Sequence, residues 1–402
     1  MTPTMIETLN QQGAAQVTSG QFEAAVETFH EMARLAPDNH ISWLNLGIAY
    51  DEIAKRDGLP STSQSYYERS LSLRITPEAL NNLALIEMHV HGNLERAEAL
   101  FEKACIQMHT PSIAYNLSIC KLMLACIRRT PGAWRDAWNW YEHRPQTAGI
   151  RGEPHLWRGE PLAGRHLLVC MEQGLGDQIW ALRWIWKAHK QGARVSVLCD
   201  QPMYRFLSEI PFIDQVFLVS TPHEFEIDYA TMSMSMAGYL TKRRPETFQL
   251  PKHTEPKIGR IGLCWSGSVT HTYQAWRNIP PDLLAPLIEA HPQYHWVSLQ
   301  KGGPAAPAGV DTSLIDDCQD VLDTANLIQS CELVISVDTM IPHLAATLGT
   351  PVWLMNRWSS CWQWGPPPAH DPGWYRGVEQ FRQPVPGDWA SVVAKMLQVL
   401  EK

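Results

Sequence analysis

A repeat of about 34 residues in the first third of the chain constrains the fold more than any other feature of the sequence. Gly13 and Gly47 stand 34 residues apart, and Asn-Leu pairs begin at Asn45, Asn82 and Asn116, in steps of 37 and 34 residues. Such a period is typical of stacked helix pairs, in which each pair buries its apolar face only against its neighbours. The sequence therefore predicts an N-terminal array of helix pairs.

Small and aromatic residues recur at matching places in these repeats. The pairs lead into Gly47, Ala84 and Ser118, and the second helices carry Tyr67, Phe101 and Tyr141. Small residues let paired helices approach closely, and aromatic side chains fill the groove between pairs. The period and the order of residue types resemble the tetratricopeptide repeat (TPR), whose arrays usually offer a concave face to a peptide or protein. The same helices also fit a generic α-bundle without a binding role.

The pattern changes after a connector rich in Pro and Gly, residues 145–164. Short apolar runs then alternate with helical stretches, which is typical of βαβ units around a parallel sheet. The expected strands are 166–170, 194–199, 215–219, 260–265, 295–299, 333–337 and 351–355. The expected helices are 178–190, 202–209, 282–290, 324–330, 341–348 and 389–401. A charged segment with prolines, residues 242–257, separates the two α/β halves.

Charge and composition exclude several classes of partner. The 402 residues include 33 basic and 41 acidic ones. Acidic side chains also outnumber basic ones within residues 1–145, by 16 to 12. A nucleic-acid-binding protein would need a basic face, so nucleic acid is a poor candidate partner.

The sequence shows no segment that is typical of membrane insertion or export. No stretch approaches the roughly 20 apolar residues of a membrane span, and residues 1–12 lack the charged and apolar regions of a signal peptide. The nine cysteines are scattered without a CxxC pair, as free thiols in a reducing compartment are. These features predict a soluble cytoplasmic protein.

A glycine-rich turn, Glu172-Gln173-Gly174-Leu175-Gly176-Asp177, lies between the first expected strand and a helix. Two glycines allow a tight turn and close approach of a ligand to the backbone. Asp177 would stand near the start of the helix, facing the space between the α/β halves, although capping alone could explain it. Ile179 occupies the position where a dinucleotide fingerprint has a third small residue, so a nicotinamide-type site is disfavoured.

A second turn follows the expected strand 333–337. Asp338 and Thr339 end the strand, and the next helix carries Pro342 in its first turn, where a missing N–H costs little. The free N–H groups and the positive end of that helix form an anion site that can hold a phosphate without a metal ion. His343 lies one turn further on. The alternatives are capping for Asp338 and Thr339, and packing for His343.

Two further turns end strands of the second half. They are Trp265-Ser266-Gly267-Ser268, followed by His271 and Arg277, and Ser298-Leu299-Gln300-Lys301. Because the carboxyl ends of parallel strands meet at one edge of a sheet, Ser266, Gly267 and Gln300 are expected to converge on Asp338. Arg277 and Lys301 are the candidate cations for a diphosphate, and either could instead be a solvated surface charge.

Tryptophan is abundant, and 16 of the 17 tryptophans lie from Trp134 onward. Trp180 and Trp184 share one face of the helix 178–190, while Ile179, Leu182 and Trp186 mark another. This helix is therefore expected to be buried on two sides, one against the sheet and the other against the array or an acceptor. A second group follows the last expected strand: Trp358, Trp362 and Trp364. They could stack on a base or a sugar, but packing at the seam between the α/β halves is the favoured interpretation.

Four segments together carry a resemblance to a known family: Leu168–Asp177, Trp265–Gly267, Ser298–Gln300 and Val334–Pro351. In these segments the chain resembles bacterial tetratricopeptide-repeat glycosyltransferases, which are similar in their catalytic part to the lipopolysaccharide heptosyltransferase family. The tail 381–389 fits as well, so the resemblance covers essentially the whole chain. It implies an α-helical TPR array followed by a GT-B glycosyltransferase of two Rossmann-like domains. It also implies inverting transfer from a nucleotide-sugar, with no required metal or other cofactor.

This resemblance assigns domains and roles. The expected domains are repeats over 1–145, an acceptor-side domain over 160–245, a donor domain over 258–385 and a closing helix over 386–402. Asp177 matches the general base. Asp338, Thr339 and His343 match the donor-holding block, joined by Ser266, Gly267, Arg277, Gln300 and Lys301, while Gln173, Gly174 and Gly176 form the acceptor-side loop.

The chain departs from the heptosyltransferase pattern in two places. Ala181 and Leu182 stand where a Pro is usual, and Arg277 is an approximate counterpart of a donor-binding Lys. These departures bear on the identity of the sugar more than on the type of reaction. The sequence also leaves open the nucleotide, the acceptor and the oligomeric state.

Three functions follow from the sequence. The leading one is a cytoplasmic glycosyltransferase whose repeats recruit a protein acceptor, such as a flagellin-like surface protein. The second is a non-catalytic TPR adaptor with a degenerate glycosyltransferase domain. The third is a nucleotide-sugar-modifying or NAD-linked Rossmann enzyme, against which the glycine spacing argues.

Overall fold

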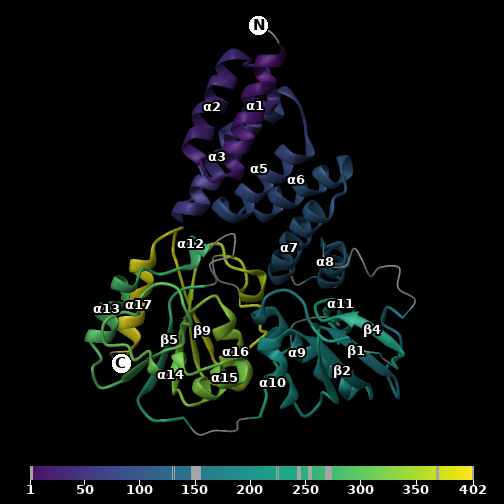
Figure 1. The fold of residues 1–402 in the computed structure, drawn as a ribbon, viewed down its shortest axis with the longest axis vertical. Helices are drawn as coiled ribbons and strands as arrows, with labels where there is room; N and C mark the ends of the chain where they lie inside the picture. The colour runs from purple at the N-terminus through teal and green to yellow at the C-terminus, as the bar shows by residue number, and fades with distance from the viewer. Residues whose placement is uncertain are drawn as a thin grey trace.

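The computed structural model describes residues 3–128, 130, 132–145, 155–222, 224, 226–241, 246–251, 256–267, 274–367 and 371–400. Figure 1 shows a helical array standing on two α/β domains that lie side by side. The predicted fold class is therefore confirmed. Ser268 and His271 lie outside the described residues. Within the described ranges, no helix combines the length and the apolar character that crossing a membrane requires.

Consecutive helices of the array pack in pairs. They are α1 (Pro3–Thr18), α2 (Phe22–Leu35), α3 (His40–Asp57), α4 (Gln64–Leu73), α5 (Pro77–Ile86) with its π-helical extension η1 (Glu87–His91), α6 (Leu94–Gln107), α7 (Pro111–Arg128) and α8 (Ala133–Tyr141). The expected small-to-aromatic contacts are present. A Cβ on Gly13 would lie 2.4 Å from the ring of Phe29, and a Cβ on Gly47 would lie 2.4 Å from the ring of Tyr67.

The contact between Gly47 and Tyr67 predicts whether replacing Gly47 by alanine raises or lowers the free energy of unfolding. Gly47→Ala should lower the free energy of unfolding by about 1–3 kcal/mol, because the added methyl group overlaps a fully buried ring. Helix propensity alone predicts the opposite, a gain of about 1 kcal/mol. Urea unfolding followed by circular dichroism decides between the two, and a stabilised variant would contradict the packing argument.

The first α/β domain is built on four parallel strands in the order β3-β2-β1-β4. The strands are β1 (His166–Cys170), β2 (Arg194–Cys199), β3 (Gln215–Leu218) and β4 (Tyr229–Met232), with helices α9 (Leu175–Lys190), α10 (Gln201–Ser208) and α11 (Met236–Leu240). The chain winds outward from β1 to β3 and then returns to the other side of β1. The topological switch point therefore lies between β1 and β4, where ligands of open α/β sheets bind beyond the strand ends.

The second α/β domain has five parallel strands in the order β6-β5-β7-β8-β9. Its strands are β5 (Arg260–Cys264), β6 (His295–Ser298), β7 (Leu333–Val337), β8 (Val352–Asn356) and β9 (Val378–Arg382). Its helices are α12 (Gln274–Arg277), α13 (Pro281–Glu289), α14 (Ser313–Asp316), α15 (Val321–Gln329), α16 (Met340–Leu348), the 3₁₀ turn η3 (Trp362–Trp364) and α17 (Trp389–Leu400). The switch point here lies between β5 and β7. Helix α17 packs on α13 and buries Trp389 and Val392 in the core of this domain.

The sequence predicts seven of the strands within one residue at each end, and two strands were not expected. β4 and β9 each lie at the end of the strand order of their sheet. Beyond β4, an isolated parallel bridge joins Ala230 to Leu156. β9 also carries Glu379 and Gln380, so its apolar content is low. β3 and β6 also lie at sheet edges, but the sequence predicts them because their apolar residues are adjacent, whereas polar residues interrupt the apolar residues of β4 and β9.

Six tryptophans form a cluster, the tryptophan junction, where the array meets both α/β domains. Its members are Trp134 and Trp138 of α8, Trp180 and Trp184 of α9, Trp362 of η3, and Trp374. The ring centroid of Trp180 lies 5.0 Å from that of Trp362 and 5.0 Å from that of Trp374, both edge-on. Helix α9 thus meets the array on one side, and Trp362 packs at the seam, as the sequence predicts.

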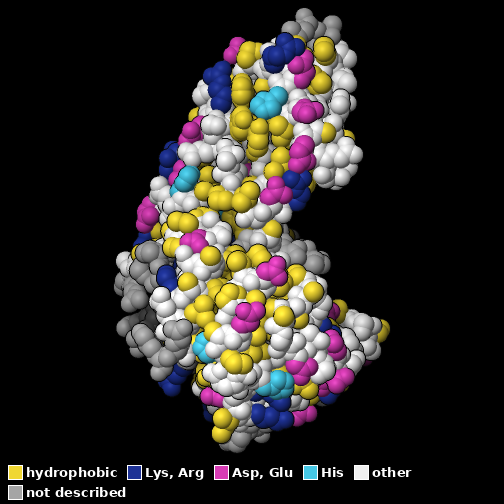
Figure 2. Space-filling view, turned by 90° about the vertical axis from the view of Figure 1, so that its left-hand side faces the viewer, with side chains coloured by type: hydrophobic (Ala, Val, Ile, Leu, Met, Phe, Trp, Pro, Cys, Tyr) yellow, Lys and Arg dark blue, Asp and Glu magenta, His cyan; other side chains and the backbone are white. Residues whose placement is uncertain are grey.

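A buried ion pair joins the array to the first α/β domain beside this junction. The guanidinium of Arg144, just after α8, donates two hydrogen bonds to the carboxylate of Glu172, just after β1, at 3.0 and 2.5 Å. Glu172 also accepts a hydrogen bond from the backbone N–H of Met234. The array is therefore anchored to the loop that precedes Asp177. Among the described residues on the face in Figure 2, basic and acidic side chains are interspersed over both the array and the α/β part.

Candidate active site between the two α/β domains

Asp177 lies in the first turn of α9, directly after the β1 switch-point loop. Its carboxylate is held from two sides. Gln363 Nε2, from the second α/β domain, donates to Oδ1 at 2.7 Å, and the Gly174 N–H donates to Oδ2 at 3.2 Å. Burial raises the pKa of Asp177 to about 6, and the hydrogen bonds only partly oppose this. A carboxylate with a pKa near 6 is suited to accept a proton at neutral pH.

The predicted acceptor-side loop has two unusual backbone features. Among the described non-glycine residues, only Gln173 has a positive φ, of 64°. Strained backbone of this kind is kept where the surroundings require it, often at functional sites. A Cβ on Gly176 would lie 2.9 Å from Cδ2 of His343, so this glycine lets α9 approach α16. The sequence indicated close approach of a ligand at Gly176, whereas the observed close neighbour is the other domain.

His343 is buried among aromatic side chains. Its Nδ1 is 2.7 Å from the hydroxyl oxygen of Tyr375, and its ring centroid lies 4.5 Å from that of Trp364. Burial lowers the pKa of His343 to about 4, so the imidazole is neutral at pH 7. His343 therefore supports the start of α16 as an uncharged packing and hydrogen-bonding group.

Asp338 and Arg277 meet at the switch point of the second domain. Arg277, which is buried, donates from Nη1 to the backbone oxygen of Asp338 at 3.0 Å, while Trp364 Nε1 donates to Asp338 Oδ1 at 2.7 Å. A Cβ on Gly267 would lie 2.5 Å from Arg277 Nε, so this glycine makes room for the guanidinium. Arg277 Nε is buried and has no hydrogen-bond partner among the described residues. A buried donor of this kind suits an anionic ligand.

The remaining predicted donor-side residues lie around the same strand ends. Gln300 Oε1 accepts from the backbone N–H of Ser266 at 2.8 Å and from the thiol of Cys264 at 3.3 Å. Cys264 Sγ is in turn 3.9 Å from Thr339 Oγ1. Thr339 caps α16 by accepting from the Ile341 N–H at 3.2 Å. The structure thus brings together Ser266, Gly267, Arg277, Gln300, Asp338, Thr339 and His343.

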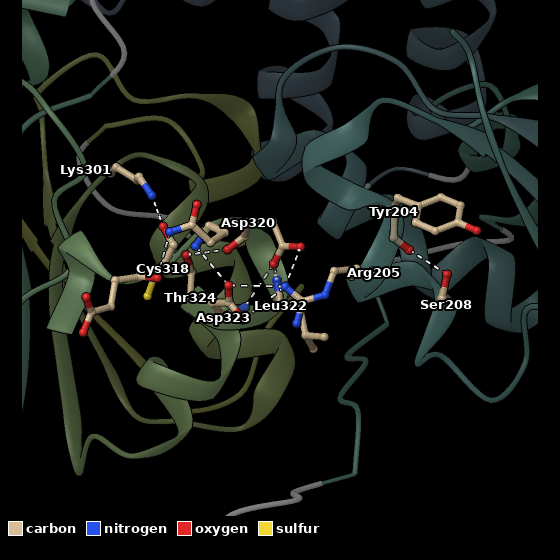
Figure 3. A network of polar contacts seen from close by, with 11 residues as sticks. Tyr204, Arg205, Ser208, Lys301, Cys318, Asp320, Leu322, Asp323 and Thr324 are labelled. Atoms are coloured by element: carbon tan, nitrogen blue, oxygen red, sulfur yellow. Dashed lines mark hydrogen bonds and ion pairs between the residues drawn. The ribbon is translucent and has the colours of Figure 1, made fainter. Parts of the chain in front are cut away.

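Lys301 belongs to a different polar network, shown in Figure 3. Its ammonium donates to the backbone oxygen of Cys318, at the start of the segment that leads to α15. In this network Arg205 of α10 pairs with Asp320 at 3.0 Å and with Asp323 at 3.3 Å. These ion pairs form a second joint between the two α/β domains. Arg277, and not Lys301, is therefore the predicted cation that touches Asp338.

Gln363 and Trp364 are site residues that sequence reasoning did not identify as such. They hold the carboxylates of Asp177 and Asp338, which lie on different domains. The one signal in the sequence is the tryptophan-rich segment after the strand 351–355, but its contacts depend on how the two domains dock. Among the described residues, no group of three or more His, Cys, Asp or Glu side chains is placed to hold a metal ion.

Comparison with known proteins gives one sequence relative and several partial structural ones. No family model matches the chain. The protein FlbA of Caulobacter vibrioides is 23% identical over 456 aligned residues, which cover 99% of this chain and 73% of FlbA. A family 9 glycosyl transferase from Veillonella parvula aligns over 60% of this chain and 98% of its own, at 12% identity and a TM-score of 0.42. The TPR protein TTC0263 of Thermus thermophilus aligns over 36% of this chain and 75% of its own, at 18% identity and a TM-score of 0.31.

Proposed function

We propose that this protein is a glycosyltransferase that moves a sugar from a nucleotide-sugar to an acceptor hydroxyl, with inversion and without a required metal ion. The acceptor is a protein recruited by the helical array. The observation that carries the proposal is the meeting of two switch points: Asp177 from one domain and Arg277 with Asp338 from the other are linked by the neighbouring residues Gln363 and Trp364. The nine free thiols support a reducing compartment such as the cytoplasm.

The second α/β domain holds the donor in this proposal. Departure of the nucleotide diphosphate breaks the bond between the anomeric carbon and a phosphate oxygen, and negative charge builds on that oxygen. The buried guanidinium of Arg277 and the positive N-terminal end of α16 are positioned to stabilise this charge. Preorganised donors of this kind fill the role that a metal ion has in other transferases.

Asp177 acts on the acceptor in this proposal. The acceptor oxygen forms a bond to the anomeric carbon on the face opposite to the departing phosphate, and its proton passes to the carboxylate. Gln363 fixes Oδ1, while Oδ2 accepts only the longer bond from the Gly174 N–H. Oδ2 is therefore the oxygen that we assign to proton transfer.

Arg277 provides the experiment that tests donor binding. A panel of UDP, GDP, ADP and CMP sugars should contain a donor that raises the melting temperature, because a ligand that binds only the folded state stabilises it. Arg277→Ala should weaken binding of that donor by about 10- to 100-fold, since hydrogen bonds to charged groups are worth about 1.5–3 kcal/mol.

Arg376→Ala is the matched control, since Arg376 is an exposed arginine of the same domain. The affinity of this variant for the donor should stay unchanged. If no nucleotide-sugar stabilises the wild-type protein, the transferase proposal fails, and a non-catalytic adaptor with TPR-like repeats becomes the better interpretation.

A further inference from the structure

A cavity of about 240 Å³ lies between the array and the second α/β domain. Figure 1 shows the place, where the lower helices of the array face α12. The array supplies most of the wall, from α3, α4, α5, η1 and the segment before α4. The lining residues are Ile48, Asp51, Glu52, Lys55, Ser61, Tyr67, Asn82, Leu85, Ile86, His89, Val90 and, from the second domain, Trp276.

Helix α12 connects this cavity to the candidate active site. Trp276 Nε1 donates to the backbone oxygen of Ala54 at 3.2 Å, which fixes the indole against the end of α3. The next residue, Arg277, donates to the backbone oxygen of Asp338. One four-residue helix therefore carries both a residue of the cavity wall and the candidate cation of the donor site.

A narrower void lies beside the cavity. It has a volume of about 10 Å³ and shares His89, Val90 and Trp276 with the cavity. Its far wall includes Arg357 and Ser359, which follow β8. Two of its lining residues are in contact, since His89 Nδ1 lies 2.5 Å from Ser359 Oγ. The void is large enough for about one water molecule.

The lining selects the chemistry of the occupant. One wall is apolar, with Ile48, Leu85 and Val90. The polar wall carries two carboxylates, Asp51 and Glu52, and the ammonium of Lys55, which pairs with Glu52 at 2.6 Å. Asp51 accepts hydrogen bonds from the uncharged hydroxyl groups of Ser61, Ser63 and Tyr67. This excess of negative charge disfavours a diphosphate. The volume is also below the roughly 300–1,000 Å³ of pockets that enclose whole small molecules.

We infer that the cavity binds a short segment of the polypeptide acceptor, in which an apolar side chain lies between neutral or basic residues. The inference rests on the proposed function, because it names the part of the acceptor that the array holds. The apolar side chain packs on Leu85, Val90 and Trp276, and the flanking positive charge lies by Asp51 and Glu52. The array thus places the acceptor next to the donor site rather than only recruiting it.

Peptide titration of the full-length protein tests this inference. The probes are acetyl-Lys-Leu-Ser-Lys-amide and acetyl-Glu-Leu-Ser-Glu-amide, followed by saturation-transfer NMR of the leucine methyl groups. We expect the basic peptide to bind at least about tenfold more tightly than the acidic one. Leu85→Trp fills the cavity from a half-buried position and should weaken binding of the basic peptide by about tenfold or more.

Ile106→Trp is the matched control, because Ile106 is 85% exposed on α6 and does not line the cavity. Leu85→Phe adds less volume and should give an intermediate loss, and circular dichroism checks that each array stays folded. Equal binding of the basic peptide to the Leu85→Trp and Ile106→Trp proteins, or a preference for the acidic peptide, would overturn the inference. Peptide binding needs no donor, so a protein that binds the basic peptide as expected but no nucleotide-sugar would refute the proposed function and leave the peptide site standing.

Discussion

Asp177→Asn should lower the rate of sugar transfer by about 10²- to 10⁴-fold, the range typical of a lost general base. Asparagine keeps the size of the side chain and can still accept a hydrogen bond from Gln363 Nε2, so the packing of α9 on α16 should persist. Donor affinity should stay within about twofold, because we propose that the second α/β domain supplies the donor contacts. Initial rates at saturating donor, together with donor titrations, measure both quantities.

The pH dependence gives this prediction a second readout. Because burial raises the pKa of Asp177 to about 6, the wild-type rate should rise with pH through about 6 and then level off, and this step should vanish in Asp177→Asn. The raised pKa of Asp177 also makes the folding stability depend on pH. A raised pKa favours the protonated folded state, so this stabilisation is present below about pH 4 and is lost as the pH rises through 6.

Asp200→Asn is the control for both readouts. Asp200 is an exposed carboxylate at the start of α10 in the same domain, without a side-chain capping bond. Its replacement should leave the rate and the pH profile unchanged. A fully active Asp177→Asn protein would remove Asp177 from the mechanism.

Trp180→Ala should lower the free energy of unfolding by about 3–5 kcal/mol, the loss typical of removing a fully buried large aromatic side chain. The reason is the position of Trp180 in the tryptophan junction. Its ring lies against Trp138 of the array, Trp184 of its own helix, and Trp362 and Trp374 of the second domain. The cavity left behind would be bordered by all three parts of the molecule, so each of them would lose packing.

Calorimetry of the wild-type and variant proteins measures this effect. The wild-type array and α/β domains should unfold together, whereas Trp180→Ala should lower the main transition or split it. Trp180→Phe keeps an aromatic ring in place and should lose clearly less stability than the alanine variant. An unchanged unfolding profile for Trp180→Ala would mean that the junction does not couple the array to the α/β domains.

Much of the fold could be predicted because local patterns determine it. The contacts of Gly13 with Phe29 and of Gly47 with Tyr67 follow from the repeat period. The strands at the centre of each sheet are continuous apolar runs, because helices or further strands cover them on all sides. β4 and β9 escaped prediction because polar residues interrupt their apolar runs, Thr231 in β4 and Glu379 with Gln380 in β9.

The candidate site was predictable to a lesser degree. Asp177, Asp338 and Thr339 stand in turns between a strand and a helix, and such turns are visible in the sequence. Their partners are not. Gln363 is 186 residues from Asp177, and Trp276 reaches the array across 222 residues to Ala54. Contacts of this kind depend on how separate domains dock, which no local pattern encodes. The position of Lys301 could not be predicted either. The sequence offered it as a cation near Asp338, whereas in the structure its ammonium contacts the Cys318 carbonyl.

The anomeric configuration of a transferred sugar tests the central claim most directly. Wild-type protein is incubated with the radiolabelled nucleotide-sugar that stabilises it and with a lysate of the source organism, and the labelled product is analysed by NMR. The account predicts a labelled protein whose sugar has the anomeric configuration opposite to that of the donor, and no such product with Asp177→Asn. Retention of configuration, or label found only in free sugar or glycolipid, would contradict it.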